Sequence, residues 1–123
     1  MNSIDFKDEA AVKDYIDRLG VEYRFQCFGE GRTDGCHRLG DWLEFSMKDW
    51  VKAGRVYKSN CLLHDYGHSC GKFANYAFLG RGTERKVDEA AEFYRKGCYS
   101  AEHPYAPVRW IACYCLWLIC MTS

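Results

Sequence analysis

The pattern that most constrains the fold of this chain is a tyrosine followed four residues later by a cysteine. It occurs three times, at Tyr23 and Cys27, Tyr57 and Cys61, and Tyr94 and Cys98. The second cysteine lies 34 residues after the first, and the third lies 37 residues after the second. A period of this size indicates an array of helical repeats, in which each unit is a pair of helices that buries its apolar face against its neighbours.

The residues before each cysteine extend the pattern into a helical stripe. In each unit, five residues share the spacing i, i+3, i+4, i+7 and i+11, which places them on one face of an α-helix. They are Ile16, Leu19, Gly20, Tyr23 and Cys27; Trp50, Ala53, Gly54, Tyr57 and Cys61; and Val87, Ala90, Ala91, Tyr94 and Cys98. The third member is always glycine or alanine, so another helix can come close there. We expect this stripe to form the first helix of each unit.

A second helix is predicted after each of the first two stripes. Its residues recur at an offset of 34: Cys36, Leu39, Gly40, Trp42 and Leu43 become Cys70, Phe73, Ala74, Tyr76 and Ala77. Asp34 and Ser69 are candidate N-caps of the second helices, and Asp49 and Asp88 are candidate caps or first-turn acids of the first helices. Residues 5–19 are expected to be helical throughout, to continue through Gly20, and to cap the array.

Paired cysteines are expected to staple these units. Cys36 and Cys70 each lie nine residues after the cysteine of the stripe before them. That is the span of one turn between antiparallel helices, so the two members of each pair should face each other within bridging distance. We predict the disulfides Cys27–Cys36 and Cys61–Cys70, each worth about 2.5 kcal/mol in the chain-entropy model. Cys98 is expected to pair with Cys113, but the pairing among Cys98, Cys113, Cys115 and Cys120 is open.

Zinc is the alternative interpretation of the second pair. Cys61, His64, His68 and Cys70 form C-x2-H-x3-H-x-C, and tetrahedral zinc accepts such a ligand set. The first unit has the same cysteine spacing with only His37 nearby, and no C-x2-C knuckle occurs. Disulfides are therefore favoured and no metal site is expected. We expect His64 and His68 to be polar loop residues and His37 to lie on a helix surface.

No motif predicts catalysis. Cys36 and His37 are sequence neighbours, and neighbours on a helix do not face each other. The chain contains no Gly-x-Ser-x-Gly sequence, phosphate-binding loop or H-E-x-x-H motif. We therefore expect a protein that is not an enzyme.

Composition bounds the partners and the compartment. Seventeen basic and seventeen acidic residues cancel, so no net charge favours nucleic acid or an anionic membrane. The longest apolar run, residues 110–121, is twelve residues long, below the roughly 20 that a membrane-spanning helix needs. Acidic residues recur through the first 20 positions, unlike a secretory leader or a mitochondrial presequence. We expect a soluble protein without a membrane span, a cleaved leader or a nucleic-acid partner.

One stretch carries a family resemblance. Leu79-Gly80-Arg81-Gly82-(x5)-Asp88-Glu89-Ala90-Ala91-(x2)-Tyr94 resembles the Sel1-like repeat. With paired cysteines added, the chain resembles bacterial cysteine-rich Sel1 proteins and, more closely, the mitochondrial cytochrome c oxidase assembly factor 7 family. The closer match covers residues 4–100 and rests on Ile4-Asp5-Phe6-Lys7-Asp8-Glu9, Val12-Lys13, Val21-Glu22, Cys27, Asp34-Gly35-Cys36, Arg38-Leu39, Asp41-x-Leu43-Glu44, Asn60-Cys61 and Ser69-Cys70-x-Lys72. After about residue 100 the chain is expected to be truncated or divergent.

The repeat pattern and this resemblance together predict an all-α fold. We expect a right-handed α-solenoid of Sel1-like helix hairpins stapled by disulfides, forming one domain over residues 1–123. Residues 1–19 would be a capping helix that leads into the first helix of repeat one, and the rest of that repeat would cover about 20–47. Repeat two would cover 48–82, and 83–123 would be a partial or divergent third repeat.

The resemblance also implies a function. It implies a non-enzymatic scaffold required for assembly of mitochondrial respiratory-chain complexes, chiefly cytochrome c oxidase (complex IV). Such a protein resides in the intermembrane space, which it enters without a presequence and where disulfide formation traps it. Its partners would be complex IV assembly clients and the oxidative import machinery of that space. The alternative is a secreted or periplasmic cysteine-rich Sel1-type protein-interaction module.

The last segment departs from the family pattern. The family's proposed haem histidines lie in the third of these second helices, where Tyr114 replaces the first one and no histidine follows His103. We therefore expect no cofactor. Trp117 stands where the earlier helices have Gly40 and Ala74, so close helix packing is not expected there. Whether residues 104–123 are a native divergent repeat is open, and a homodimer through this apolar helix is a hypothesis.

Overall fold

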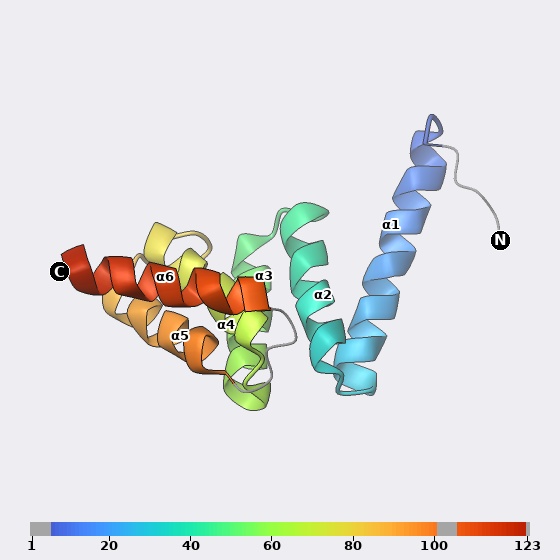
Figure 1. Cartoon of the computed structure of the whole chain (residues 1–123). Helices are drawn as coiled ribbons and strands as arrows, with labels where there is room; N and C mark the ends of the chain where they lie inside the picture. Colours follow the sequence, from blue (N-terminus) through green and yellow to red (C-terminus); the bar gives the residue numbers. More distant parts are fainter. Residues whose placement is uncertain (1–5, 101–105, 123) are drawn as a thin grey trace.

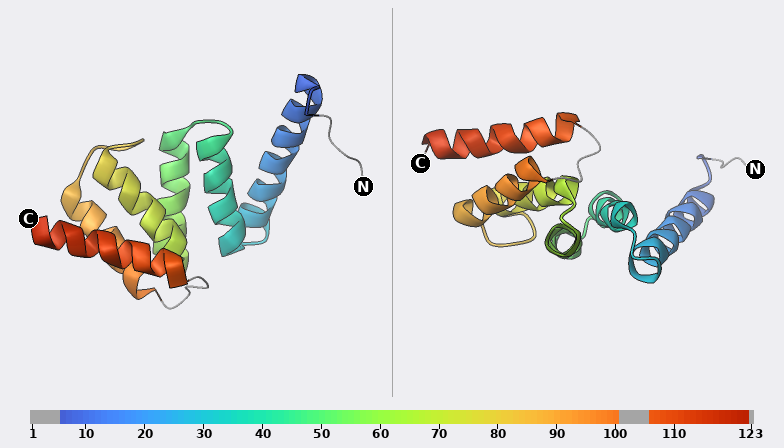
Figure 2. Two further views of the ribbon diagram at one scale, coloured as in Figure 1. Left: turned by 45° about the horizontal axis from the view of Figure 1, so that its top comes forward. Right: turned by 60° about the horizontal axis from the view of Figure 1, so that its bottom comes forward.

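The computed structural model describes residues 6–100 and 106–122 as a chain of helices. They are α1 (Glu9–Arg24), a π-helical turn η1 (Phe25–Gly29), α2 (Thr33–Phe45), α3 (Trp50–His64), α4 (Gly67–Leu79), α5 (Val87–Tyr99) and α6 (Ala106–Thr122). Each helix packs against the next one along the chain, and α6 also packs against α4 (Figure 1; Figure 2). The predicted all-α class is confirmed, since no strand occurs in the described ranges.

The first helix is shorter at its start than predicted. α1 begins at Glu9 because the Asp8 side chain accepts hydrogen bonds from the backbone N–H groups of Ala10 and Ala11, which makes Asp8 the N-cap. Asp5, the expected start, lies outside the described residues. The helix continues through Gly20 as expected, and Gly20 lies directly against the Trp42 ring of α2.

The predicted caps divide into two groups. Asp49 caps α3 through the backbone N–H of Lys52 at 3.1 Å, and Asp88 is a first-turn acid of α5, as expected. Asp34 and Ser69 are not N-caps, because α2 begins at Thr33 and α4 begins at Gly67. Both residues lie inside their helices, and the Ser69 hydroxyl is instead occupied by tertiary hydrogen bonds.

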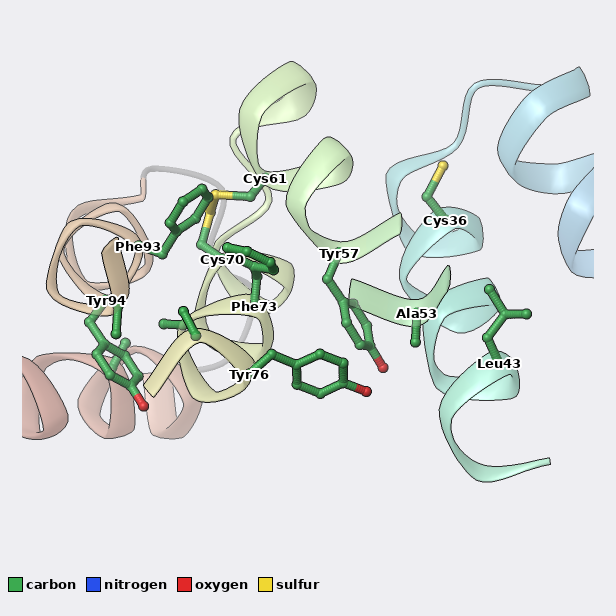
Figure 3. Packing of buried hydrophobic residues seen from close by; sticks show 14 of the residues in the cluster. Cys36, Leu43, Ala53, Tyr57, Cys61, Cys70, Phe73, Tyr76, Phe93 and Tyr94 are labelled. Carbon is green, nitrogen blue, oxygen red and sulfur yellow. A yellow bond between two sulfur atoms is a disulfide. The ribbon is translucent and has the colours of Figure 1, made fainter. Parts of the chain in front are cut away.

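The predicted stripes form the core between the hairpins (Figure 3). The structure buries Gly20 and Cys27 of the first stripe, whereas Ile16, Leu19 and Tyr23 are only partly buried. The buried members of the other two stripes are Ala53, Gly54, Tyr57, Cys61, Ala90, Tyr94 and Cys98. Tyr57 is fully buried, and its ring lies against Gly40 of α2, where any side chain would overlap it. Gly40 therefore lets the bulky Tyr57 ring lie close to α2. Gly54, the small member of the second stripe, likewise lies against the Tyr76 ring of α4, as the stripe predicts.

The last helix buries less of its surface. In α6, Ala112 and Ile119 join the core, whereas five other apolar side chains of the helix are exposed: Ile111, Tyr114, Trp117, Leu118 and Met121. Trp117 is 55% exposed, so this position makes no close helix contact of the kind that Gly40 makes, as predicted. In the described part of the chain, no helix combines the length and the apolar character needed to cross a membrane.

Candidate functional site

Three disulfides hold the helix hairpins together. The structure joins Cys27 to Cys36 and Cys61 to Cys70, the two pairs that the nine-residue spacing predicts. It also joins Cys98 to Cys113, which resolves the pairing that the sequence left open. Cys115, half-buried, and Cys120, exposed, are not in disulfides. Each disulfide therefore links the end of one helix to the helix that follows it.

Two kinds of turn bring these cysteines together. Cys27 lies in the π-helical turn η1, whose last residue is Gly29, while α3 ends at His64 and its C-cap residue, Asp65, has a left-handed conformation. Five of the six bridged cysteines are at most 8% exposed, and they are Cys27, Cys36, Cys61, Cys70 and Cys98. Buried bridges are poorly accessible to an attacking thiolate, so Cys27–Cys36 and Cys61–Cys70, in which both cysteines are buried, are structural rather than exchangeable.

Tyrosine hydroxyls connect consecutive hairpins at equivalent positions. Tyr57 of α3 donates a 2.5 Å hydrogen bond to Asp41 of α2, and Tyr94 of α5 donates to Asn75 of α4. Asp41 and Asn75 are 34 residues apart and follow the small residues at 40 and 74. Burial raises the pKa of Tyr57 far above its usual value, so its hydroxyl remains a donor. The sequence analysis did not predict that Asp41 and Asn75 accept hydrogen bonds, although the 34-residue offset between them could have indicated it.

His37 is buried, which contradicts its expected place on a helix surface. The residue is 5% exposed, and its ring stacks on the His68 ring with centroids 3.9 Å apart. Its Nδ1 lies 2.7 Å from the Ser69 hydroxyl. The reason is that α4 begins two residues before Ser69, so its first turn covers His37. His64 and His68 are also not loop residues, since they lie in the last turn of α3 and the first turn of α4.

Ser69 connects His37 of α2 to Asn60 of α3 through hydrogen bonds. The Asn60 amide donates to the Thr33 carbonyl at 3.0 Å and to the Ser69 hydroxyl at 2.8 Å. Ser69 and His37 Nδ1 share a further hydrogen bond, in which either group can donate depending on the imidazole tautomer, and His37 Nε2 has no hydrogen-bond partner among the described residues. That nitrogen is 3.6 Å from Asp41, beyond hydrogen-bond range.

This buried network has the residue types of a catalytic triad but the environment of a structural core. Ser69 is fully buried, so no substrate reaches its hydroxyl. Burial, together with the nearby charges of His68, Lys72 and Arg38, lowers the pKa of His37 to about 3. A base with such a pKa would not activate a serine near neutral pH. The arrangement instead ties α2, α3 and α4 together.

A second buried network connects α2 to α4. Glu44, 7% exposed, accepts a 2.7 Å hydrogen bond from the Lys72 ammonium and a 2.6 Å hydrogen bond from the Tyr76 hydroxyl. Both carboxylate oxygens are thereby satisfied, as a buried charge requires. Among the described residues, no group of three or more metal-ligating side chains could hold an ion, so the C-x2-H-x3-H-x-C sequence does not form a zinc cage there.

Comparison with known proteins places this hairpin architecture in a family. No protein-family model matches the chain. It is 48% identical over 97 residues, or 76% of its length, to the cytochrome c oxidase assembly factor 7 homolog of Drosophila melanogaster. It is 38% identical over 96 residues to cytochrome c oxidase assembly factor 7 of Danio rerio and of Homo sapiens, which is 77% of its length in each case. Over this matched part, the chain belongs to the cytochrome c oxidase assembly factor 7 family.

The predicted family assignment is thus confirmed, with a defined extent. The matched segment covers 36% of the Drosophila melanogaster protein and 42% of the other two. The chain therefore spans less than half the length of these cytochrome c oxidase assembly factor 7 relatives. In this family member, the three disulfides and the two buried networks hold the helices together as an array of hairpins.

A surface cavity of this assembly factor 7 family member offers a candidate binding surface. It has a volume of about 340 Å³ and lies where the first hairpin turn meets the C-terminal half of α3. The Cys27–Cys36 disulfide, Val56 and Leu63 form part of its wall. The cavity is preformed by covalent and hydrogen-bonded neighbours, which is typical of binding sites.

Proposed function

We propose that this chain is a non-enzymatic scaffold for assembly of mitochondrial respiratory-chain complexes, chiefly cytochrome c oxidase. The observation that carries the proposal is the 48% identity to a protein named as a cytochrome c oxidase assembly factor 7 homolog. The buried state of Ser69 and the low pKa of His37 support a non-catalytic role. The scaffold acts by binding protein partners, the complex IV assembly clients, and it needs no cofactor.

The proposed compartment is the mitochondrial intermembrane space. Three disulfides in a small helical protein favour an oxidising compartment. Oxidative import, in which disulfide formation traps the folded chain, would then supply the Cys27–Cys36 and Cys61–Cys70 bridges. The alternative is a secreted or periplasmic interaction module, which would form the same bridges in a different place.

The proposed finer architecture is a right-handed solenoid of Sel1-like repeats. The offset of 34 residues between equivalent side chains supports it, as do the equivalent Tyr57–Asp41 and Tyr94–Asn75 hydrogen bonds. Repeat one would then cover about 20–47, after a capping segment over 1–19, and repeat two would cover 48–82. Residues 83–123 would form a divergent third repeat.

Complementation tests the function. The full chain is expressed in cells that lack their own assembly factor 7, and complex IV activity and assembled complex IV on native gels are measured. We expect both to rise toward the normal level, with the protein protected from protease until the outer mitochondrial membrane is opened. Unchanged complex IV despite correct localisation would overturn the proposal, and secretion of the chain would favour the alternative module. Unaltered absorbance of the purified protein on hemin addition would support the absence of a cofactor.

A further inference from the structure

The cavity beside the first disulfide has an apolar rim. Phe28 and Leu63, which both line it, are each 74% exposed, although large apolar side chains are usually buried. Phe28 belongs to the turn η1 and Leu63 to the last turn of α3, so the two come from different hairpins. A cavity flanked by exposed apolar side chains from two elements is typical of a surface that accepts an apolar group.

The walls of this cavity are fixed before any partner arrives. The Cys27–Cys36 disulfide holds the turn against α2, and the Asn60 amide holds α3 to the Thr33 carbonyl. Asn60 is 2% exposed and also donates to Ser69 of α4. Because these contacts exist without a partner, little ordering is needed on binding, which favours affinity.

The charge around the cavity has one sign. Its lining includes the cationic Arg55 and the basic His64, and no acidic side chain lines it. Arg55 forms no ion pair with the described residues, whereas Arg18, Arg32, Arg38 and Arg95 each pair with a carboxylate. An unpaired guanidinium beside an apolar cavity is complementary to a carboxylate that accompanies an apolar group.

We propose that this cavity binds a segment of a partner protein that presents a bulky apolar side chain next to an acidic one. The apolar side chain occupies the space between Phe28, Val56 and Leu63, and the carboxylate lies against Arg55. The proposal rests on the proposed function, since it identifies the surface through which the scaffold would hold a protein client.

Capped tetrapeptides test the proposal without any assembly assay. Three probes are titrated into the purified full chain: acetyl-Ala-Phe-Glu-Ala-amide and the same peptide with glutamine or with lysine in place of glutamate. Backbone amide shifts in a two-dimensional ¹H–¹⁵N NMR spectrum report the site and the affinity. We expect shifts at Arg55, Val56, Ser59 and Leu63, with the glutamate peptide binding about threefold more tightly than the glutamine peptide and the lysine peptide binding most weakly.

Exposed side chains provide matched variants that keep the fold. Arg55→Glu should reverse the order of the three peptides, and Leu63→Ser should weaken all of them alike. Lys52→Glu makes the same charge change on the same helix, outside the cavity, and should leave the order unchanged. An Arg55→Glu variant that keeps the original order would overturn the role of the charge.

Further outcomes would overturn the proposal as a whole. They are equal binding of the three peptides, shifts that map to another face, binding of decanoate but not of the peptides, and self-association of the chain through these residues. Failure of complementation with intact peptide binding would contradict the proposed function only. Absent peptide binding with intact complementation would contradict this surface only.

Discussion

At the scale of single residues, close approach between helices depends on glycine, which has no side chain. Gly40 lies under the Tyr57 ring, and a Cβ atom built there would overlap it. Tyr57 is fully buried and bound to Asp41, so the ring has no room to move away. Gly71 of α4 differs, because nothing lies within 4 Å of the position where its Cβ would be.

These two glycines give a matched pair of variants. Gly40→Ala should lower the free energy of unfolding by about 1–3 kcal/mol, since the added methyl overpacks the helix contact. Gly71→Ala should raise it by about 0.5–1 kcal/mol, because alanine favours a helix interior without meeting a neighbour. Urea unfolding followed by circular dichroism measures both. Equal effects of the two substitutions would contradict the packing described at Gly40.

The lowered pKa of buried His37 makes the stability of the protein depend on pH. Its pKa falls from a usual 6.5 to about 3 in the folded protein, so between these values the unfolded chain binds a proton that the folded chain does not. Stability is therefore fully present above pH 6.5 and decreases as the pH falls toward 3, by about 2 kcal/mol between pH 7 and pH 5. Asp41, whose carboxyl pKa burial raises, acts in the opposite direction.

Comparison with a variant isolates the contribution of His37. His37→Gln should be less stable at pH 7 but should lose less of its stability between pH 7 and pH 5 than the unchanged protein. Urea midpoints at the two pH values measure this difference. An unchanged pH dependence in the variant would show that other groups cause it.

At the scale of elements, the disulfides compensate for short helices. Each hairpin buries a limited apolar face, and a bridge that closes a nine-residue loop adds about 2.5 kcal/mol by restricting the unfolded chain. Replacing both Cys61 and Cys70 with alanine should therefore cost at least this amount, with a further loss from the cavity at Cys70, which is fully buried. Thermal unfolding by circular dichroism measures the loss. Cys120→Ala removes an exposed thiol that is in no disulfide, and it should lower the midpoint less than the double replacement does.

The elements also show which features the sequence can predict. The stripe that contains Ala53, Tyr57 and Cys61 was predictable because one helical period and one 34-residue offset describe it. The start of α4 was not, because a serine that looks like an N-cap is recruited by His37 and Asn60, residues that are distant in sequence. The same tertiary contact explains the unexpected burial of His37. Local propensity does not encode a partner from another hairpin.

The candidate site likewise has one part that local spacing predicts and one part that depends on contacts between hairpins. The bridges at Cys27–Cys36 and Cys61–Cys70 follow from spacing alone. The cavity beside the first of them depends on where Leu63 of α3 comes to lie relative to Phe28, which only the packed hairpins determine. That Arg55 forms no ion pair with the described residues is likewise a property of the folded surface.

At the scale of the whole molecule, α6 leaves an apolar face open. Tyr114 and Trp117 stack on each other there with centroids 6.1 Å apart, and both are more than half exposed. We propose that a second copy of the chain covers this face, since burial of such side chains would drive association. Light scattering after size exclusion should then show a dimer that dissociates on dilution. Trp117→Glu should give a monomer at all concentrations, while Lys52→Glu should not. A monomeric unchanged protein would contradict the dimer.

The tyrosine hydrogen bonds make the array directional. The segment 48–82 carries the donor Tyr57, which reaches back to the hairpin before it, and the acceptor Asn75, which receives a tyrosine from the hairpin after it. Because this segment carries one donor and one acceptor, two copies of it in series can form the same hydrogen bond between them. A chain with 48–82 inserted twice in tandem should fold into an array longer by one hairpin, with the added Tyr57 seated on the preceding Asn75. In α6, Trp117 and Leu118 occupy the positions of the small residue and of the hydrogen-bond acceptor. Insertion of the segment inside the array should therefore succeed, and its addition after α6 should fail.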